Sequence, residues 1–329
     1  MPVRDEGSYI KRSLSAVLAQ DYPCNRMEVI IADGLSTDET RNIISDLTKR
    51  NPQWAICMID NPEKFMPNGM STALEQAKGE VIVLVGGHCE IAPDYIRRCI
   101  DLLEKAKPDC VGGPMITIGE NWVAKTIAQA QSSTFGVGGV AFRIGSDKSG
   151  YVDTVAFGAY RSEVFEHLGG FDKELVRNHD DEFNFRLTQS GGKIWFDPSI
   201  KSIYHSRANL RSLWRQYFEY GLYKVRVIQK RRAVPSWRHL VPGVFVLSLF
   251  LTILLALIMS EPLWLLVVAG PYAAANLFTS LWTARRDWKT LPLLPIAFST
   301  LHLSYGIGFL FGIWRWRKFG LRILMAGSK

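Results

Sequence analysis

Three clusters of polar residues could do chemistry, and the most acidic of them is formed by Asp180, Asp181 and Glu182. A carboxylate in this run could act as a general base that takes the proton of an attacking hydroxyl. Acids at the start of a helix also interact favourably with the helix dipole, which is a purely structural alternative. Glycine pairs at 169–170 and 191–192 allow tight turns on both sides of the cluster, and this favours a cleft built around it.

The second cluster begins at Asp33, directly after the β-branched run 27–32. A carboxylate at the end of a strand can accept a hydrogen bond from a base N–H or a ribose hydroxyl. The alternative is an ordinary helix start, because Ser36 and Glu39 have the spacing of a capping box. The local sequence supports a nucleotide contact and a helix cap about equally.

The third cluster, Gly86, Gly87, His88 and Glu90, follows the apolar run 81–85. Two glycines leave room for a diphosphate or a sugar to approach the backbone. His88 and Glu90 are candidate ligands of a divalent metal. A histidine at the end of a strand is more often structural, so this cluster alone is a weak signal.

The first 205 residues alternate between helical and extended patterns, which is typical of an α/β domain with a largely parallel sheet. The functional site of such a domain lies at the carboxyl ends of its strands, where the three clusters fall. Strands are predicted at 27–32, 55–59 and 81–85, and helices at 9–20, 36–50 and 71–77.

Five ordered motifs in residues 1 to about 205 resemble those of the inverting family-2 glycosyltransferases of the GT-A fold. The matching segments are Pro2 to Glu6, Gln20 to Pro23, Asp33 to Thr40, Gly169 to Asp172 and His179 to Leu187. Within that family, residues 136–143, 158–161 and 220–224 resemble the succinoglycan-type exopolysaccharide enzymes, which extend lipid-linked oligosaccharides and carry a C-terminal membrane region.

The resemblance implies a GT-A domain at 1–230 that moves one sugar, a hexose from a UDP-sugar, onto a lipid-linked or polysaccharide-precursor acceptor. Asp180 matches the catalytic base. The residues expected to bind the nucleotide are Pro2, Arg4, Glu6, Asp33, Ser36, Gly86 and Gly87. The residues expected on the acceptor or diphosphate side are Asp181, Glu182, Arg186, Tyr220 and Lys224.

The sequence departs from the family pattern at two places. Gly86 and His88 stand where the family has the two aspartates of its D-x-D element, which puts metal binding in doubt. His88 and Glu90 could still coordinate Mn²⁺ or Mg²⁺, or basic side chains could replace the metal. The family also has a strand of about five apolar residues before the position of Pro2, so the first strand is expected to be missing.

A membrane region with two or three transmembrane helices is predicted for residues 231–329. The apolar runs 240–259, 262–282 and 291–314 each have the length that spans a bilayer. Basic residues before the first run and after the second place both ends of this hairpin, and the catalytic domain, on the cytoplasmic side of the inner (plasma) membrane. The path of the third run stays open, because a crossing would place the basic segment Arg315 to Arg322 outside, and its prolines and glycines permit a re-entrant path.

The net charge of +8 is better explained by lipid headgroups than by nucleic acid, because much of it flanks the apolar runs.

Two other functions compete with single-sugar transfer. One is a non-catalytic membrane scaffold or nucleotide-sugar-binding subunit of the same fold. The other is a processive polysaccharide synthase, which ranks lower because the Q-x-x-R-W element of such enzymes is absent from the sequence. Tyr220 and Lys224 could line an acceptor site or belong to an interfacial amphipathic helix.

Overall fold

The computed structural model describes the backbone of residues 1–326 and the side chains of residues 1–317. Contacts divide the chain into two compact units. The first unit contains Met1–Thr117 and Val140–His205, and the second contains Ile118–Gly139 and Ser206–Lys329. The boundary predicted near residue 230 from composition differs from this division, because helix α10 (Leu210–Arg231) packs along helix α13 (Leu294–Ala326). Each unit is described separately below.

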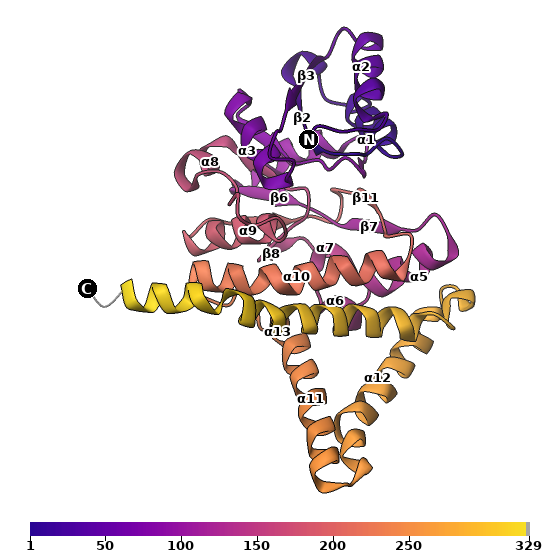
Figure 1. The fold of residues 1–329 in the computed structure, drawn as a ribbon. Coiled ribbons are helices and arrows are strands. Elements are labelled where there is room, and N and C mark those ends of the chain that lie inside the picture. Colours follow the sequence, from indigo (N-terminus) through magenta and orange to yellow (C-terminus); the bar gives the residue numbers. More distant parts are fainter. Residues whose placement is uncertain (327–329) are drawn as a thin grey trace. The chain divides into compact units, whose positions relative to one another are not determined.

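The elements follow the predicted alternation through the first 205 residues (Figure 1). The strands are β1 Pro2–Val3, β2 Glu28–Asp33, β3 Ala55–Asp60, β4 Val81–Val83, β5 Cys89–Ile91, β6 Cys110–Gly112, β7 Met115–Ile118, β8 Gly150–Val152, β9 Ala159–Arg161, β10 Ile194–Phe196 and β11 Ser202–His205. The helices before α10 are α1 Ile10–Leu18, α2 Thr40–Arg50, α3 Met66–Gln76, α4 Tyr95–Lys105, α5 Trp122–Gln131, α6 Thr134–Val137, α7 Ala141–Ile144, α8 Ser162–Leu168 and α9 His179–Gln189.

A parallel three-stranded sheet, in the order β1-β2-β3, organises the N-terminal part of the first unit. Its register pairs Val3 with Asp33 and Asp33 with Asp60, so all three strands end at the same edge. The middle strand is apolar from Val29 to Ala32, and all of these side chains except that of Ile30 are buried, as the β-branched run predicts. Two aspartates are therefore placed side by side at the carboxyl edge of the sheet.

Two further sheets complete the first unit. One is mixed and has the order β4-β9-β6-β10-β8, and the other has the order β5-β11-β7. Strand β4 leads into the Gly86–Glu90 segment, and α9 packs against the β9–α8 region through an apolar core that includes Phe183 and Tyr160. The fold thus brings the second and third polar clusters to strand ends and the first to a helix start, as expected.

Two predicted helices begin elsewhere in the structure. Helix α2 begins at Thr40 and not at Ser36, because residues 34–39 form a loop in which Leu35 adopts a positive φ of 55°. Helix α3 begins at Met66, five residues before its predicted start, with Pro67 in its first turn, where a proline's missing N–H is tolerated. Pro2 and Val3 form the two-residue strand β1, and the strand expected before Pro2 stays a prediction.

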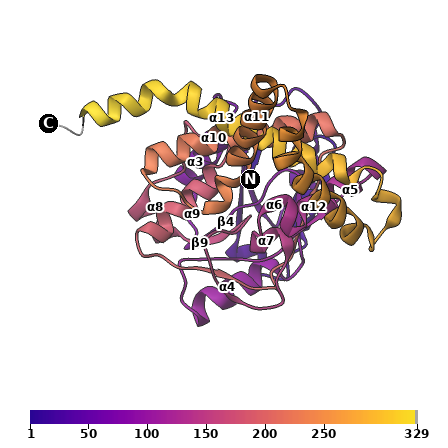
Figure 2. The same ribbon diagram turned by 90° about the horizontal axis from the view of Figure 1, so that it is seen from below.

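Among its described residues, the second unit contains three helices long and apolar enough to cross a membrane. Helices α11 (Val241–Met259) and α12 (Leu266–Ala284) form a hairpin that turns at Ser260 and Glu261. Helix α13 runs beside α10, crosswise to the open end of that hairpin (Figure 1), and the view from below in Figure 2 also shows α10 and α13 together. Of the basic residues predicted to follow the third run, Lys318 and Arg322 lie outside the residues whose side chains are described.

Candidate active site

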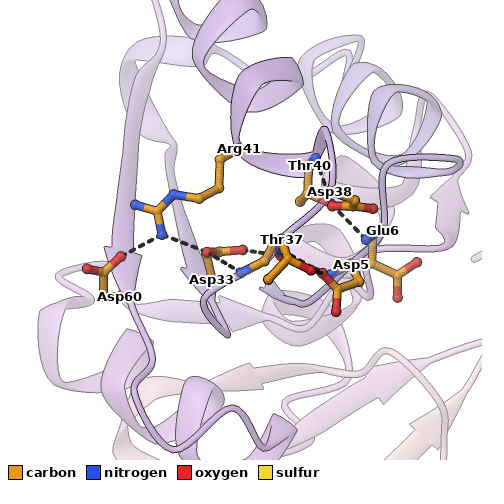
Figure 3. Close-up of polar contacts among 9 residues, drawn as sticks. Asp5, Glu6, Asp33, Thr37, Asp38, Thr40, Arg41 and Asp60 are labelled. Atoms are coloured by element: carbon orange, nitrogen blue, oxygen red, sulfur yellow. Dashed lines mark hydrogen bonds and ion pairs between the residues drawn. The ribbon is translucent and has the colours of Figure 1, made fainter.

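Asp33, the last residue of β2, is the centre of a polar network at the sheet edge (Figure 3). Its carboxylate has no exposed surface. It accepts hydrogen bonds from the Ser36 hydroxyl at 2.5 Å and from the Ser36 backbone N–H at 3.1 Å. It also pairs with the Arg41 guanidinium at 2.7 Å, and the same Arg41 nitrogen reaches Asp60 at 2.8 Å. The hydrogen bond to Asp60, and then that to Asp33, raise the pKa of Arg41, so the bridge stays charged.

The loop after β1 is joined to the loop before α2. Asp5 accepts a hydrogen bond from the backbone N–H of Thr37, and Asp38 accepts one from the backbone N–H of Thr40 (Figure 3). Asp38 also accepts a hydrogen bond from the backbone N–H of Gly7. Partial burial raises the pKa of Asp38, but these bonds and one from the Thr40 hydroxyl outweigh it, so the pKa is lowered. The loops on which Arg4, Glu6 and Ser36 lie are thus fixed to each other.

The capping box predicted between Ser36 and Glu39 is not formed. The Ser36 hydroxyl donates to Asp33 and accepts from the backbone N–H of Asp5. Glu39 is the N-cap residue of α2, but its side chain makes no capping hydrogen bond. The helix-cap alternative for this segment is therefore wrong, and the nucleotide contact of Asp33 stays a prediction. Of the other predicted nucleotide residues, Pro2 is buried in β1 and Arg4 is half exposed and packs over Gly34.

The two candidate metal ligands are engaged with different partners. His88 Nδ1 lies 2.8 Å from a Glu6 carboxylate oxygen, and Glu90 lies 2.7 Å from His205 Nε2. The Tyr9 ring lies between the two imidazoles, with ring centroids 6.5 Å from His88 and 5.2 Å from His205. We call these five residues the histidine cluster.

The histidine cluster does not form a ligand set for a metal ion. Among the side chains that the structure describes, no three His, Cys, Asp or Glu groups are placed to hold one. Gly87 is explained by packing, because a Cβ on it would lie 2.8 Å from the Glu6 side chain. The absence of a Cβ at Gly87 therefore permits the contact between Glu6 and the 86–88 loop. We assign no catalytic step to a metal.

Asp180 lies in the first turn of α9, after Asn178 in the left-handed conformation. Its side chain is exposed, and no hydrogen bond or ion pair joins it to another described residue. The neighbouring His179 is buried, and its burial lowers the pKa of the imidazole. A neutral histidine therefore stands next to Asp180 at neutral pH, and the carboxylate keeps its lone pairs available.

Helix α9 is held by side chains on its other faces. Asn184 accepts a hydrogen bond from the Tyr160 hydroxyl at 2.7 Å and donates to Thr154 at 2.8 Å. The Phe183 ring, fully buried, stacks on Phe165 with centroids 4.7 Å apart. These contacts fix the helix whose first turn carries Asp180.

Glu182 and Arg186, predicted on the acceptor or diphosphate side, are bound to each other. Glu182 is fully buried and accepts from Arg186 Nε at 2.9 Å. The same guanidinium donates to the carbonyl oxygens of Leu168 at 2.6 Å and Gly170 at 2.7 Å. Arg186 therefore ties the glycine turn at 169–170 to α9, and both side chains are used inside the unit.

The other residues predicted on the acceptor or diphosphate side are Asp181, Tyr220 and Lys224. Asp181 is half buried beside Asp180. Tyr220 and Lys224 lie on α10 in the second unit, where the Tyr220 hydroxyl accepts a hydrogen bond from Gln216 and Lys224 is buried. Their assignment to an acceptor site stays a prediction.

A cavity of about 470 Å³ opens elsewhere in the first unit, between α3, α8 and the 169–171 turn. Its wall includes Ser71, Leu74, Glu75, Phe165, Gly170 and Phe171, and none of the predicted site residues lines it. The cavity therefore does not locate the chemistry, which we place from the polar groups at the strand ends and the start of α9.

Sequence reasoning did not identify four residues that shape these sites: Arg41, Asp60, Asn184 and His205. Asp60 could have been identified from the sequence, because it ends a second parallel strand and neighbouring parallel strands end at one edge of the sheet. Arg41, Asn184 and His205 are defined by contacts with residues distant in the sequence, which spacing alone does not reveal.

Comparisons with known proteins show the family to which the chain belongs. The family described as "Glycosyl transferase family 2" matches residues 1–169. The succinoglycan biosynthesis protein ExoA of Rhizobium meliloti is 30% identical over 313 residues, which cover 94% of this chain and 92% of that protein. A dolichyl N-acetyl-alpha-D-glucosaminyl phosphate 3-beta-D-2,3-diacetamido-2,3-dideoxy-beta-D-glucuronosyltransferase of Methanococcus voltae is 29% identical, covering 70% of this chain and 73% of that protein.

The fold is similar to that of a solved glycosyltransferase. The mannosyltransferase PcManGT of Pyrobaculum calidifontis, in complex with GDP-Man and Mn²⁺, superposes with a TM-score of 0.56 at 19% identity, over 92% of this chain and 85% of that one. This likeness confirms the GT-A-type architecture predicted from the motifs. Sequence match, relatives and fold together establish that the chain belongs to glycosyltransferase family 2 and is an inverting glycosyltransferase.

Proposed function

We propose that this glycosyltransferase moves one hexose from a UDP-sugar onto a lipid-linked acceptor at the cytoplasmic face of the plasma membrane. The observation that carries the proposal is the contrast around Asp180. Its carboxylate is exposed and forms no hydrogen bond or ion pair with a described side chain, while α9 is fixed on its other faces. A general base needs this combination of a free lone pair and a fixed position.

In the proposed reaction, Asp180 takes the proton of an acceptor hydroxyl while that oxygen attacks the anomeric carbon of the donor sugar. The bond from the anomeric carbon to the nucleoside diphosphate breaks as the new glycosidic bond forms on the opposite face, so the configuration inverts. Negative charge develops on the departing diphosphate and must be stabilised. Arg4 and Arg41 carry the partly exposed guanidinium groups at the nucleotide edge, and we assign this task to them.

Asp33 is assigned to the nucleotide base, together with Pro2, Glu6, Ser36, Gly86 and Gly87 around it. The Asp33 carboxylate has no exposed surface, so contact with a base requires its cover to move. Arg41 is that cover, and its side chain is 37% exposed. We infer that the base replaces Arg41 on Asp33 and leaves the guanidinium free for the diphosphate.

The acceptor and the location are argued from the second unit and from the relatives. Helices α11 and α12 contain no charged residue, and basic residues such as Arg238 and Arg285 lie at the open end of the hairpin. By the positive-inside tendency that end, and the first unit, face the cytoplasm. The name of the Methanococcus relative includes a dolichyl phosphate-linked sugar, which supports a lipid-linked acceptor here.

A transfer assay with the full chain in membranes tests this function. Membranes are incubated with radiolabelled UDP-hexoses or with GDP-mannose, and the lipids are then extracted. We expect label from a UDP-hexose in a lipid product that is longer by one sugar and has the inverted configuration. Absence of transfer from every donor would contradict the proposal, a long polymer would indicate a processive synthase, and parallel reactions with EDTA or Mn²⁺ measure the metal dependence.

A further inference from the structure

Helix α13 packs along α10 through glycines. A Cβ on Gly308 would lie 2.1 Å from the Phe218 carbonyl oxygen, and one on Gly312 would lie 2.9 Å from that of Leu222. On α10, a Cβ on Gly221 would lie 2.1 Å from the Tyr305 carbonyl oxygen. The two backbones therefore approach more closely than any larger residue would allow, as small residues permit in other helix pairs.

The sequence left open a re-entrant path that the glycines of α13 permit. In the structure these glycines instead allow close packing on α10. The helix is continuous from Leu294 to Ala326. Later residues of α13 meet later residues of α10, since Gly308 faces Phe218 and Gly312 faces Leu222. The two helices run side by side in the same direction, so any segment of α13 that entered the bilayer core would take α10 with it.

Helix α10 is not suited to the bilayer core. Its charged residues are Arg211, Arg215, Glu219, Lys224, Arg226, Lys230 and Arg231. Charged side chains at the centre of a transmembrane helix are strongly disfavoured. The most apolar stretch of α13 is 50% buried within the protein, against 11% for each helix of the hairpin, so protein covers half of this stretch but little of α11 and α12.

The first half of α13 is also part of a protein core. Leu294, Phe298 and Leu301 are fully or almost fully buried in a cluster with Ile127 of α5 and Leu213 of α10. The connection before it is fixed to α5 as well, because Trp122 donates to the Lys289 carbonyl oxygen at 2.8 Å. The start of α13 is therefore held at the open end of the hairpin, as Figure 1 shows.

We propose that α10 and α13 lie together in the membrane plane, against the lipid headgroups at the base of the α11–α12 hairpin. The chain then crosses the bilayer twice and not three times, and the C-terminal end of α13 stays on the same side as the first unit. Tryptophan–arginine pairs suit this headgroup layer: Arg285 lies 4.0 Å from the Trp282 ring centroid, and Arg317 lies 5.5 Å from that of Trp314. The inference rests on the proposed cytoplasmic orientation of the first unit and not on catalysis.

Reporter fusions to the full chain test the number of crossings. Alkaline phosphatase, active only outside the cytoplasm, and a green fluorescent protein, fluorescent only inside, are each fused after Lys329 or inserted between Ser260 and Glu261. We expect fluorescence and background phosphatase activity after Lys329, and active phosphatase at the hairpin tip. Active phosphatase after Lys329 would overturn the proposal, and so would inactive phosphatase at both positions.

A glycine variant tests what holds α13 in place. Gly308→Leu should separate α13 from α10, and the released apolar helix should then cross the membrane, so that phosphatase after Lys329 becomes active. The matched control is Gly270→Leu on α12, where a Cβ meets only Leu266 at 3.9 Å. Unchanged topology in Gly308→Leu would overturn the role of the glycine contact. Sugar transfer by the unmodified wild-type chain reports separately on the proposed function.

Discussion

Two aspartates of the first unit occupy opposite environments. Asp33 is fully buried and accepts hydrogen bonds from Ser36 and Arg41. Asp180 is exposed and is joined to no described residue by a hydrogen bond or ion pair. A carboxylate whose lone pairs are already engaged is a poor proton acceptor, whereas one with free lone pairs can accept a proton. Environment, and not residue type, separates the two proposed roles.

The difference follows from the elements that carry them. Asp33 ends the middle strand of a parallel sheet, so strands β1 and β3 lie on both sides of it. Asp180 belongs to the exposed face of a helix start, and the opposite faces of α9 make the packing contacts through Phe183 and Asn184. We therefore expect substitutions at the two positions to affect different measurements.

The largest effect is expected for Asp180→Asn. The amide keeps the size of the side chain but cannot take the proton, so the transfer rate should fall by about 10²–10⁴-fold. The midpoint of thermal unfolding should stay that of the wild type. Asp46→Asn, on an exposed pair with Arg50, is the matched control and should keep full activity. Similar rates for both variants would remove Asp180 from the chemistry.

Asp33→Asn should act on stability first. Ser36 and Arg41 lose a charged acceptor in a buried position, so unfolding should become easier by about 1.5–3 kcal/mol. The measurement is the unfolding midpoint in detergent, followed by tryptophan fluorescence, again with Asp46→Asn as the control. An unchanged midpoint would mean that the network around Asp33 does not stabilise the sheet edge.

Arg186→Lys should make the position of Asp180 less fixed, without removing the base itself. A lysine cannot donate at once to Glu182, Leu168 and Gly170, as the guanidinium does. If poorer positioning of Asp180 raises the activation free energy by about 1.4 kcal/mol, kcat falls about tenfold. We expect KM for the donor to stay unchanged, and Arg50→Lys to have no effect. A change in KM alone would instead assign Arg186 to donor binding.

The smallest effect is expected for Asp60→Asn. Arg41 keeps its bond to Asp33, and the lost partner is more than half exposed, so stability should change by less than about 1 kcal/mol. UDP affinity, measured by titration calorimetry, should change less than in Asp33→Asn. A larger loss for Asp60→Asn would reverse the proposed order of the two aspartates at the sheet edge.

Much of this arrangement could be predicted from the sequence, because it depends on local patterns. The apolar run before Asp33 predicts a buried strand, and the acidic run at 180–182 predicts a helix start, and both are present. The hairpin of α11 and α12 follows from length and hydropathy. The family was predicted from five motifs in order, and the comparisons confirm it.

The parts that could not be predicted depend on contacts between distant segments. Ser36 bonds to Asp33 and Asp5 in place of capping a helix, because the loop after β1 lies next to it. Glu182 and Arg186 pair with each other, since the glycine turn brings two carbonyl oxygens to Arg186. The third apolar run has the composition of a membrane helix, but only its packing on α10 shows what covers it.

The division of roles between the two aspartates is tested most directly by measuring UDP affinity and single-turnover sugar transfer on the same preparations. We predict that Asp180→Asn binds UDP as tightly as the wild type and loses transfer, whereas Asp33→Asn binds UDP more weakly. Transfer at the wild-type rate by Asp180→Asn, with UDP bound, would contradict the assignment of the base.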